Sequence, residues 1–251
     1  MVCSSGHDAR HRETHRKPAT VPPPRHTKGL PGPHRDELLR LLAAAAANVC
    51  QHDGKGHKYD ENKYLGGRLR RTEWGSRFTA GAKDFMAYGV YAVVSGPLHG
   101  KIILAYQGSS CDAHLVQDFK QLLGGRFKFV ADKAQVIFED VCPDFITGHS
   151  LGGCIAEVIC SRTGCPGAAF NSPGPWSPDP DHCVVDGEKH GGVNFEIHLA
   201  VADPLVSLAN TSAGRMPHSH IGSEASGAVR WHYNISGLHS MDAMVNVLGR
   251  L

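Results

Sequence analysis

The stretch PDFITGHSLGGCIAEVICSRTG, residues 143–164, predicts a strand, a sharp turn and a helix in direct succession. Residues 143–147 form a short run typical of a strand, and residues 154–164 carry apolar side chains at helical spacing. Between them, GHSLGG at 148–153 places glycines two positions before and after a serine, where they let the backbone fold back without a clash. We therefore expect the hydroxyl of Ser150 to project from a cramped strand-to-helix bend.

This bend is the arrangement that a nucleophilic hydroxyl needs, so Ser150 is the candidate nucleophile. The following helix would direct its first N–H groups toward the reaction centre, and the N–H of Leu151 is placed to donate to a developing oxyanion. The alternative is an ordinary glycine-rich turn with a surface serine. That alternative explains neither the apolar run before the turn nor the helix after it.

The segments around this unit predict further strands and helices. YAVVSG (91–96) and KIILAYQG (101–108) are β-branched and aromatic runs on either side of a short turn, which is typical of a hairpin. The other candidates are helices at 36–50, 129–141 and 240–248 and strands at 167–170 and 194–202. Strands and helices that alternate over about 160 residues predict an α/β fold with a sheet covered on both faces. Residues 51–80 show no clear period and support no prediction.

The first 35 residues differ from the rest in composition. They hold six prolines, five histidines and a net charge of +5, whereas residues 36–251 carry a net charge of −3. We expect a disordered basic head at 1–35, because its few apolar side chains cannot offset the entropy lost on ordering, and one folded domain at 36–251. The charge of this domain is not that of a nucleic-acid-binding surface, so we expect no nucleic-acid partner. The head is compatible with a peripheral contact to a membrane.

The sequence favours a cytoplasmic protein with free thiols. No stretch reaches the length of about eighteen apolar residues that a transmembrane helix needs. The alanine-rich run at 41–50 would be an unusually late secretory signal. The eight cysteines stand singly, without a C-x-x-C pair, so we expect neither a disulfide scaffold nor a zinc site. His7, His11 and His15 would stack on a helix, but they lack an acidic or cysteine partner for a metal, which favours a solvated tail.

Three blocks of sequence are informative together. They are ITGHSLGG (146–153), ILAYQGSS followed by DAHLVQDF (103–119), and VADPLV (201–206). In this order they resemble the class 3 lipase family, the α/β-hydrolases of the fungal triacylglycerol lipase type, over about residues 85–245. The chain departs from the family at Gln107, where arginine is usual, and at His114-Leu115, where tryptophan is common. The resemblance implies the α/β-hydrolase fold, with a mostly parallel sheet, and activity on lipid acyl esters.

The resemblance also implies that the second oxyanion donor is Ser109, which follows Gly108, through its backbone N–H. A turn directly after a buried strand delivers rigid N–H groups at the carboxyl edge of the sheet, where Ser150 would also lie. The alternative is that Ser109 and Ser110 simply form a turn.

A serine nucleophile needs a histidine base and a carboxylate that orients this base, and in this fold the order is serine, carboxylate, histidine. Asp203 follows the predicted strand at 194–202 and precedes Pro204, although an Asp-Pro turn is the alternative interpretation. His239 is the candidate base, because it enters a terminal helix where the family resemblance also places the base. His232 is the second candidate, but its aromatic neighbours are more typical of a strand. Weaker candidates are Asp179, Asp181, Asp186, His218 and His220.

These residues together predict transfer of an acyl group to water, with Ser150 as nucleophile, and they require neither a metal nor an organic cofactor. The resemblance implies a lipid substrate such as a glyceride or phospholipid. Chain length, head group and oligomeric state stay open. The alternative class is a non-catalytic α/β-hydrolase that acts as a scaffold or binding protein, with the basic head as its recognition arm. Intact candidates for every catalytic role argue against it, because a scaffold has no physical need of them.

Overall fold

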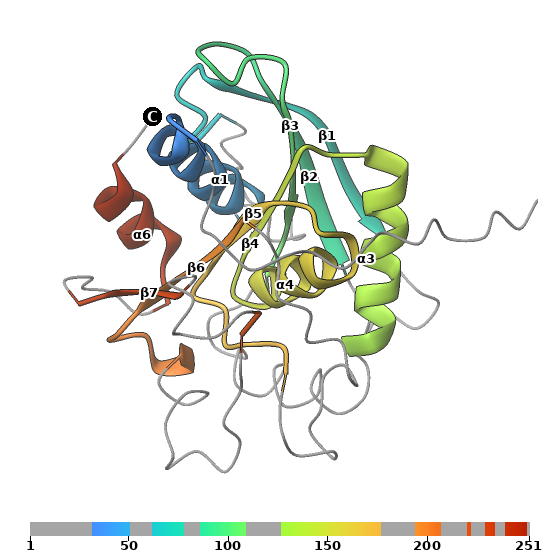
Figure 1. Cartoon of the computed structure of the whole chain (residues 1–251), viewed down its shortest axis with the longest axis vertical. Helices are drawn as coiled ribbons and strands as arrows, with labels where there is room; N and C mark the ends of the chain where they lie inside the picture. Colours follow the sequence, from blue (N-terminus) through green and yellow to red (C-terminus); the bar gives the residue numbers. More distant parts are fainter. Residues whose placement is uncertain are drawn as a thin grey trace, which may run out of the picture.

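A seven-stranded sheet runs through the part of the chain that the computed structural model describes (Figure 1). The described residues are 32–50, 62–77, 86–108, 127–176, 194–206, 220–221, 229–233 and 239–249. The strands follow one another across the sheet in chain order: β1 (Leu69–Arg77), β2 (Met86–Val93), β3 (Ile102–Tyr106), β4 (Phe145–His149), β5 (Gly167–Phe170), β6 (Phe195–Ala200) and β7 (Val229–His232). The first three strands pair in antiparallel fashion, and β3 to β7 pair in parallel.

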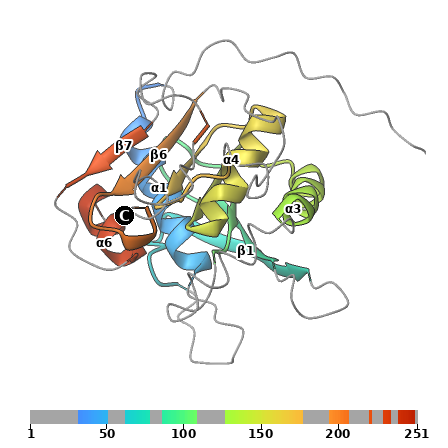
Figure 2. The same ribbon diagram turned by 90° about the horizontal axis from the view of Figure 1, so that it is seen from below.

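Helices cover both faces of this sheet (Figures 1 and 2). One face carries α1 (Arg35–Val49) and α6 (Met241–Leu248), and the other carries α3 (Phe127–Val141) and α4 (Leu151–Thr163). Along β3, Ile103 and Ala105 belong to the apolar cluster under α1, whereas Leu104 and Tyr106 belong to the cluster under α4. This alternation is the two-residue period of a strand that is buried on both faces. The predicted α/β fold, with a mostly parallel sheet covered by helices on both faces, is therefore confirmed.

The alanine-rich helix α1 lies directly on the sheet. Its run of alanines at 43–47 is fully buried, and these small side chains let the helix approach the strands closely. The Thr147 hydroxyl donates to the carbonyl of Leu42 at 3.3 Å, which ties α1 to the strand before the predicted bend. Buried Asn48 donates to the carbonyl of Lys63 at 2.8 Å and accepts from the Tyr91 hydroxyl at 2.8 Å. The buried amide side chain of Asn48, near the C-terminal end of α1, thus has hydrogen-bond partners inside the protein.

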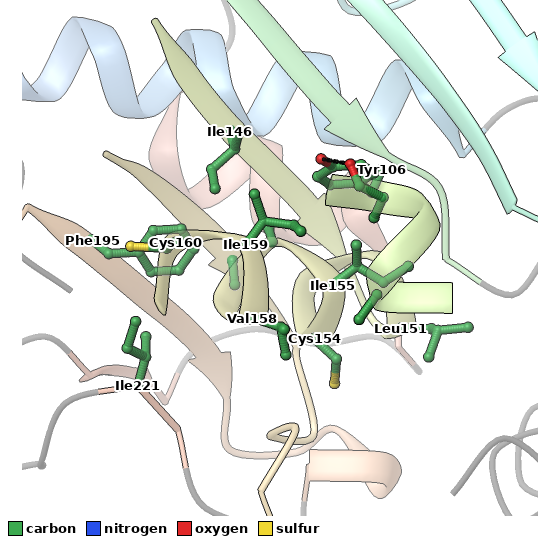
Figure 3. Close-up of a cluster of buried hydrophobic side chains, with 14 of the residues drawn as sticks. Tyr106, Ile146, Leu151, Cys154, Ile155, Val158, Ile159, Cys160, Phe195 and Ile221 are labelled. Carbon is green, nitrogen blue, oxygen red and sulfur yellow. Dashed lines mark hydrogen bonds between the residues drawn. The ribbon is translucent and has the colours of Figure 1, made fainter. Parts of the chain in front are cut away.

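On the face of the sheet opposite α1, α4 packs directly against the strands. Figure 3 shows Ile155 and Ile159 of α4 directed toward Tyr106 and Ile146 of the sheet. All four side chains are buried, and the Tyr106 hydroxyl donates to the carbonyl of Ala134 in α3 at 3.1 Å. This packing holds the start of α4 in a fixed position above the carboxyl ends of the strands.

Several sequence expectations need adjustment. The segment 51–80, which supports no prediction from its pattern, contains strand β1 at the edge of the sheet. The hairpin strands lie at 86–93 and 102–106, so the first begins five residues earlier than expected. The helix after the bend begins at Leu151, since the glycines of the motif are already helical. Most of the expected head, as well as Ser109, lies outside the described residues.

Two findings concern the cysteines and the helices of the described residues. The cysteines in the described residues, at 50, 142, 154, 160 and 165, are all free. Within the same residues, no helix combines the length and apolar character required to cross a membrane.

Candidate active site

Ser150 lies on a sharp bend between β4 and α4. Its backbone has φ 58° and ψ −124°, a region that side-chain-bearing residues occupy only at a cost of about 1–3 kcal/mol. The neighbouring glycines make the bend sterically feasible. A Cβ at Gly148 would overlap the carbonyl oxygen of Gly152, and a Cβ at Gly152 would overlap the carbonyl oxygen of Tyr106. The Gly-x-Ser-x-Gly spacing is therefore required by backbone contacts at both ends.

Backbone hydrogen bonds fix this bend to the sheet. The N–H of Ser150 donates to the carbonyl of Phe170 in β5 at 2.9 Å, and the carbonyl of Ser150 accepts from the N–H of Cys154 at 3.1 Å. Leu151 is the first residue of α4, so its N–H has no acceptor within the helix. This N–H is adjacent to the Ser150 side chain and is available to a ligand atom.

Asp203 and His239 form a buried pair. The Nδ1 of His239 lies 2.6 Å from Oδ2 of Asp203, and because an ionised carboxylate only accepts, the Nδ1–H is the donor. The other carboxylate oxygen, Oδ1, accepts the N–H groups of Leu205 at 2.9 Å and Val206 at 3.2 Å. Asp203 is therefore held on both oxygens, and it fixes the tautomer that leaves Nε2 of His239 unprotonated.

The pair lies beside the bend. The ring of His239 packs on the ring of His149, with centroids 4.5 Å apart, and His149 is the residue directly before Ser150. Within the described residues, neither Oγ of Ser150 nor Nε2 of His239 has a hydrogen-bond partner, although both atoms are buried. The structure thus brings Ser150, Asp203 and His239 to the same edge of the sheet, without a direct serine–histidine hydrogen bond.

His149 is part of this cluster, and the sequence interpretation did not select it. Burial, and secondarily the nearby His239, holds its pKa well below the ordinary value for histidine. His149 is therefore a neutral ring beside His239. The sequence signal that could have identified His149 was its position within GHSLGG. A position between a strand and a serine does not by itself predict that an ionisable side chain belongs to the site.

Ser109, the expected second oxyanion donor, lies outside the described residues, but its neighbour Gly108 does not. A Cβ at Gly108 would lie 2.6 Å from the carbonyl oxygen of His149 and 3.2 Å from Cβ of Ser150. The end of β3 therefore packs directly against the bend. Ser109 follows this contact by one residue, and its role stays a prediction.

The other acid and base candidates are placed differently. His232 ends β7 and pairs with His198 rather than with Asp203, with Nε2 of His232 and Nδ1 of His198 2.9 Å apart. His220 lies 3.0 Å, through Nδ1, from Oε1 of Glu157, a fully buried carboxylate on α4. Asp179, Asp181, Asp186 and His218 lie outside the described residues. Within the described residues, no group of three or more histidine, cysteine or acidic side chains is arranged to hold a metal ion.

The described residues define an α/β protein with a strained serine and a buried histidine–aspartate pair at the carboxyl edge of its sheet. No family model matches the sequence, and no curated protein matches it. Among solved structures, the chain is similar to lipase II from Rhizopus niveus, with 15% sequence identity and a TM-score of 0.39 over 72% of this chain and 76% of that chain.

Proposed function

We propose that this protein is a serine hydrolase of the α/β-hydrolase fold that cleaves carboxylic esters, with lipid acyl esters such as glycerides or phospholipids as substrates. The observation that carries the proposal is the 2.6 Å hydrogen bond between His239 and Asp203, next to a serine with a strained backbone and a buried hydroxyl that lacks a hydrogen-bond partner among the described residues. Proteins retain backbone strain of this kind where the strained residue has a chemical role.

In the proposed reaction, Oγ of Ser150 attacks the ester carbonyl carbon and its proton passes to Nε2 of His239. Asp203 stabilises the resulting imidazolium through the Nδ1–H. The N–H of Leu151, together with that of Ser109, donates to the oxyanion of the tetrahedral intermediate. His239 then returns the proton to the leaving alcohol, which gives an acyl-enzyme. Water, deprotonated by His239, releases the acid and restores Ser150.

Apolar side chains lie next to two of the candidate site residues. Leu151, next to the nucleophile, and Val206, three residues after Asp203, both belong to the buried apolar cluster under α4. Ser150 is only 2% exposed, so an ester reaches its hydroxyl only after the atoms that cover it move.

The proposal is tested by labelling the full-length chain with a fluorophosphonate probe. We expect covalent labelling of the parent protein and none of Ser150→Ala. Ser161→Ala is the matched control, because Ser161 is a second buried serine, within α4, and we expect this variant to label as the parent does. A folded parent that does not label, or a Ser150→Ala variant that labels fully, would overturn the assignment and favour a scaffold.

The substrate class needs a separate measurement. We expect p-nitrophenyl esters of increasing acyl length to be cleaved with rising kcat/KM up to long chains, and faster at a lipid interface. A preference for short soluble esters contradicts the lipid part of the proposal and leaves the hydrolase part intact.

A further inference from the structure

A groove with a volume of about 820 Å³ lies away from the candidate active site. It is formed by the first turns of α1, the edge strand β7 and the end of α6, which lie on the same side of the molecule in Figure 1. None of Ser150, Asp203 or His239 lines it. Its volume is in the range of cavities that bind small molecules.

Arginines dominate the charge of this groove. Arg35, Arg40 and Arg230 line it, and Asp36 is the single carboxylate among the described lining residues. Arg35 is already engaged, because its Nε and Nη2 atoms donate to the two carboxylate oxygens of Glu196 at 2.7 and 2.6 Å. Within the described residues, Arg40 and Arg230 form no ion pair with a carboxylate. The groove therefore holds two guanidinium groups available to an anion.

The buried carboxylate beneath the groove does not neutralise these two arginines. Although burial alone would raise the pKa of Glu196, hydrogen bonds from His198 and Arg35 lower it to about 2, so this carboxylate is charged and fully paired. His198 in turn stacks on His232, with ring centroids 5.2 Å apart. Burial lowers the pKa of both histidines, and so the floor of the groove is a pair of neutral aromatic rings.

The remaining wall is apolar. Leu39 of α1 and Val247 and Leu248 of α6 line the groove, and Val247 is 48% exposed. A simple inorganic anion would pair with the arginines but would leave this wall in water. A ligand with an anionic head and an alkyl chain would cover both parts.

We propose that this groove binds an anionic amphiphile, a single alkyl chain with a carboxylate or phosphate head, whose head pairs with Arg40 and Arg230 while the chain lies along Val247 and Leu248. This site is independent of the proposed hydrolase reaction, because none of its groups takes part in that chemistry.

The test is direct binding of dodecyl phosphate and dodecanoate, below their micelle concentrations, to the full-length chain by calorimetry. Dodecyl maltoside, which has the same chain and a neutral head, is the ligand control. We expect Arg40→Ala and Arg230→Ala each to weaken binding of the anionic ligands about fivefold, and the double variant at least tenfold. Arg70→Ala, which removes an exposed arginine on β1 outside this groove, is the protein control and should bind as the parent does.

Arg230→Glu keeps a long polar side chain at the edge strand but reverses its charge, so it should abolish binding of the anionic ligands without unfolding the protein. Equal binding of dodecyl maltoside, or unchanged binding by the double variant, would overturn the proposal. Retention on phosphatidylserine vesicles without binding of the monomeric ligands would also overturn it, in favour of an electrostatic contact with a membrane surface.

Discussion

Replacing Ser150 with glycine is expected to stabilise the protein while removing its nucleophile. The φ of 58° and ψ of −124° at Ser150 cost a non-glycine residue on the order of 1–3 kcal/mol. The buried hydroxyl, which lacks a partner among the described residues, costs about 1 kcal/mol more. Glycine removes both costs. It also lowers the free energy of unfolding by about 1 kcal/mol, because it increases the conformational freedom of the unfolded chain. The expected net gain in the free energy of unfolding is about 2 kcal/mol.

The Ser150→Ala variant separates the two contributions. Alanine removes the hydroxyl but keeps the strained backbone, so it should gain only about 1 kcal/mol. Both gains are measured by urea unfolding of the full-length chain, extrapolated linearly to zero urea. If glycine is no more stable than alanine at this position, the strain argument is refuted. If both variants are less stable than the parent, neither cost exists. The site would then show no trade-off between stability and function.

The remaining predictions concern the residues that support the site and the folded state. Asp203→Asn should lower kcat for ester hydrolysis by about 10³–10⁴-fold, with KM little changed, because an amide stabilises the wrong histidine tautomer. Glu157→Leu should cost about 3–5 kcal/mol in urea unfolding, since this fully buried carboxylate accepts hydrogen bonds from a serine hydroxyl, a backbone N–H and a histidine that would all lose their acceptor. Gly152→Ala should lower the thermal midpoint markedly, because the new Cβ overlaps the carbonyl oxygen of Tyr106. Burial, and then the nearby histidine at 198, lowers the pKa of His232 from 6.5 to about 4, so the unfolded chain binds a proton in this window that the folded chain does not. Stability should therefore fall as the pH falls from 6.5 toward 4, and His232→Gln should flatten that part of a urea-unfolding profile.

The unit around Ser150 could be predicted because its determinants are local. The strand, the glycines and the helix lie within residues 143–164, and each glycine is required by a contact with a neighbour in the same bend or in the adjacent strand. The hairpin before it is likewise local, since β2 and β3 pair directly across a short turn. Such segments carry their own structural information, and tertiary contacts only confirm it.

Strand β1 shows where local patterns stop being informative. Its sequence, LRRTEWGSR, places charged residues on both faces, and the pairing register with β2 shifts between Arg71 and Glu73. The bulge breaks the two-residue alternation that would otherwise identify a strand. Because β1 lies at the edge of the sheet, its conformation is set by pairing with β2 rather than by its own apolar pattern.

The polar partners of the interior could not be predicted for a related reason. Glu157 stands in an otherwise apolar helix and Glu196 in an apolar strand, so the sequence indicates that each must find a partner but does not identify it. Each glutamate has a partner that is distant in the chain: His220 lies 63 residues after Glu157, and Arg35 lies 161 residues before Glu196, whose other partner, His198, is two residues away. The hydrogen bond between Asp203 and His239 spans a shorter 36 residues, and here the chemistry of a serine nucleophile supplied the missing constraint. A functional hypothesis can therefore anticipate a long-range contact where local structure cannot, and the two buried glutamates, for which no reaction prescribed a partner, stayed unassigned until the fold itself brought their partners together.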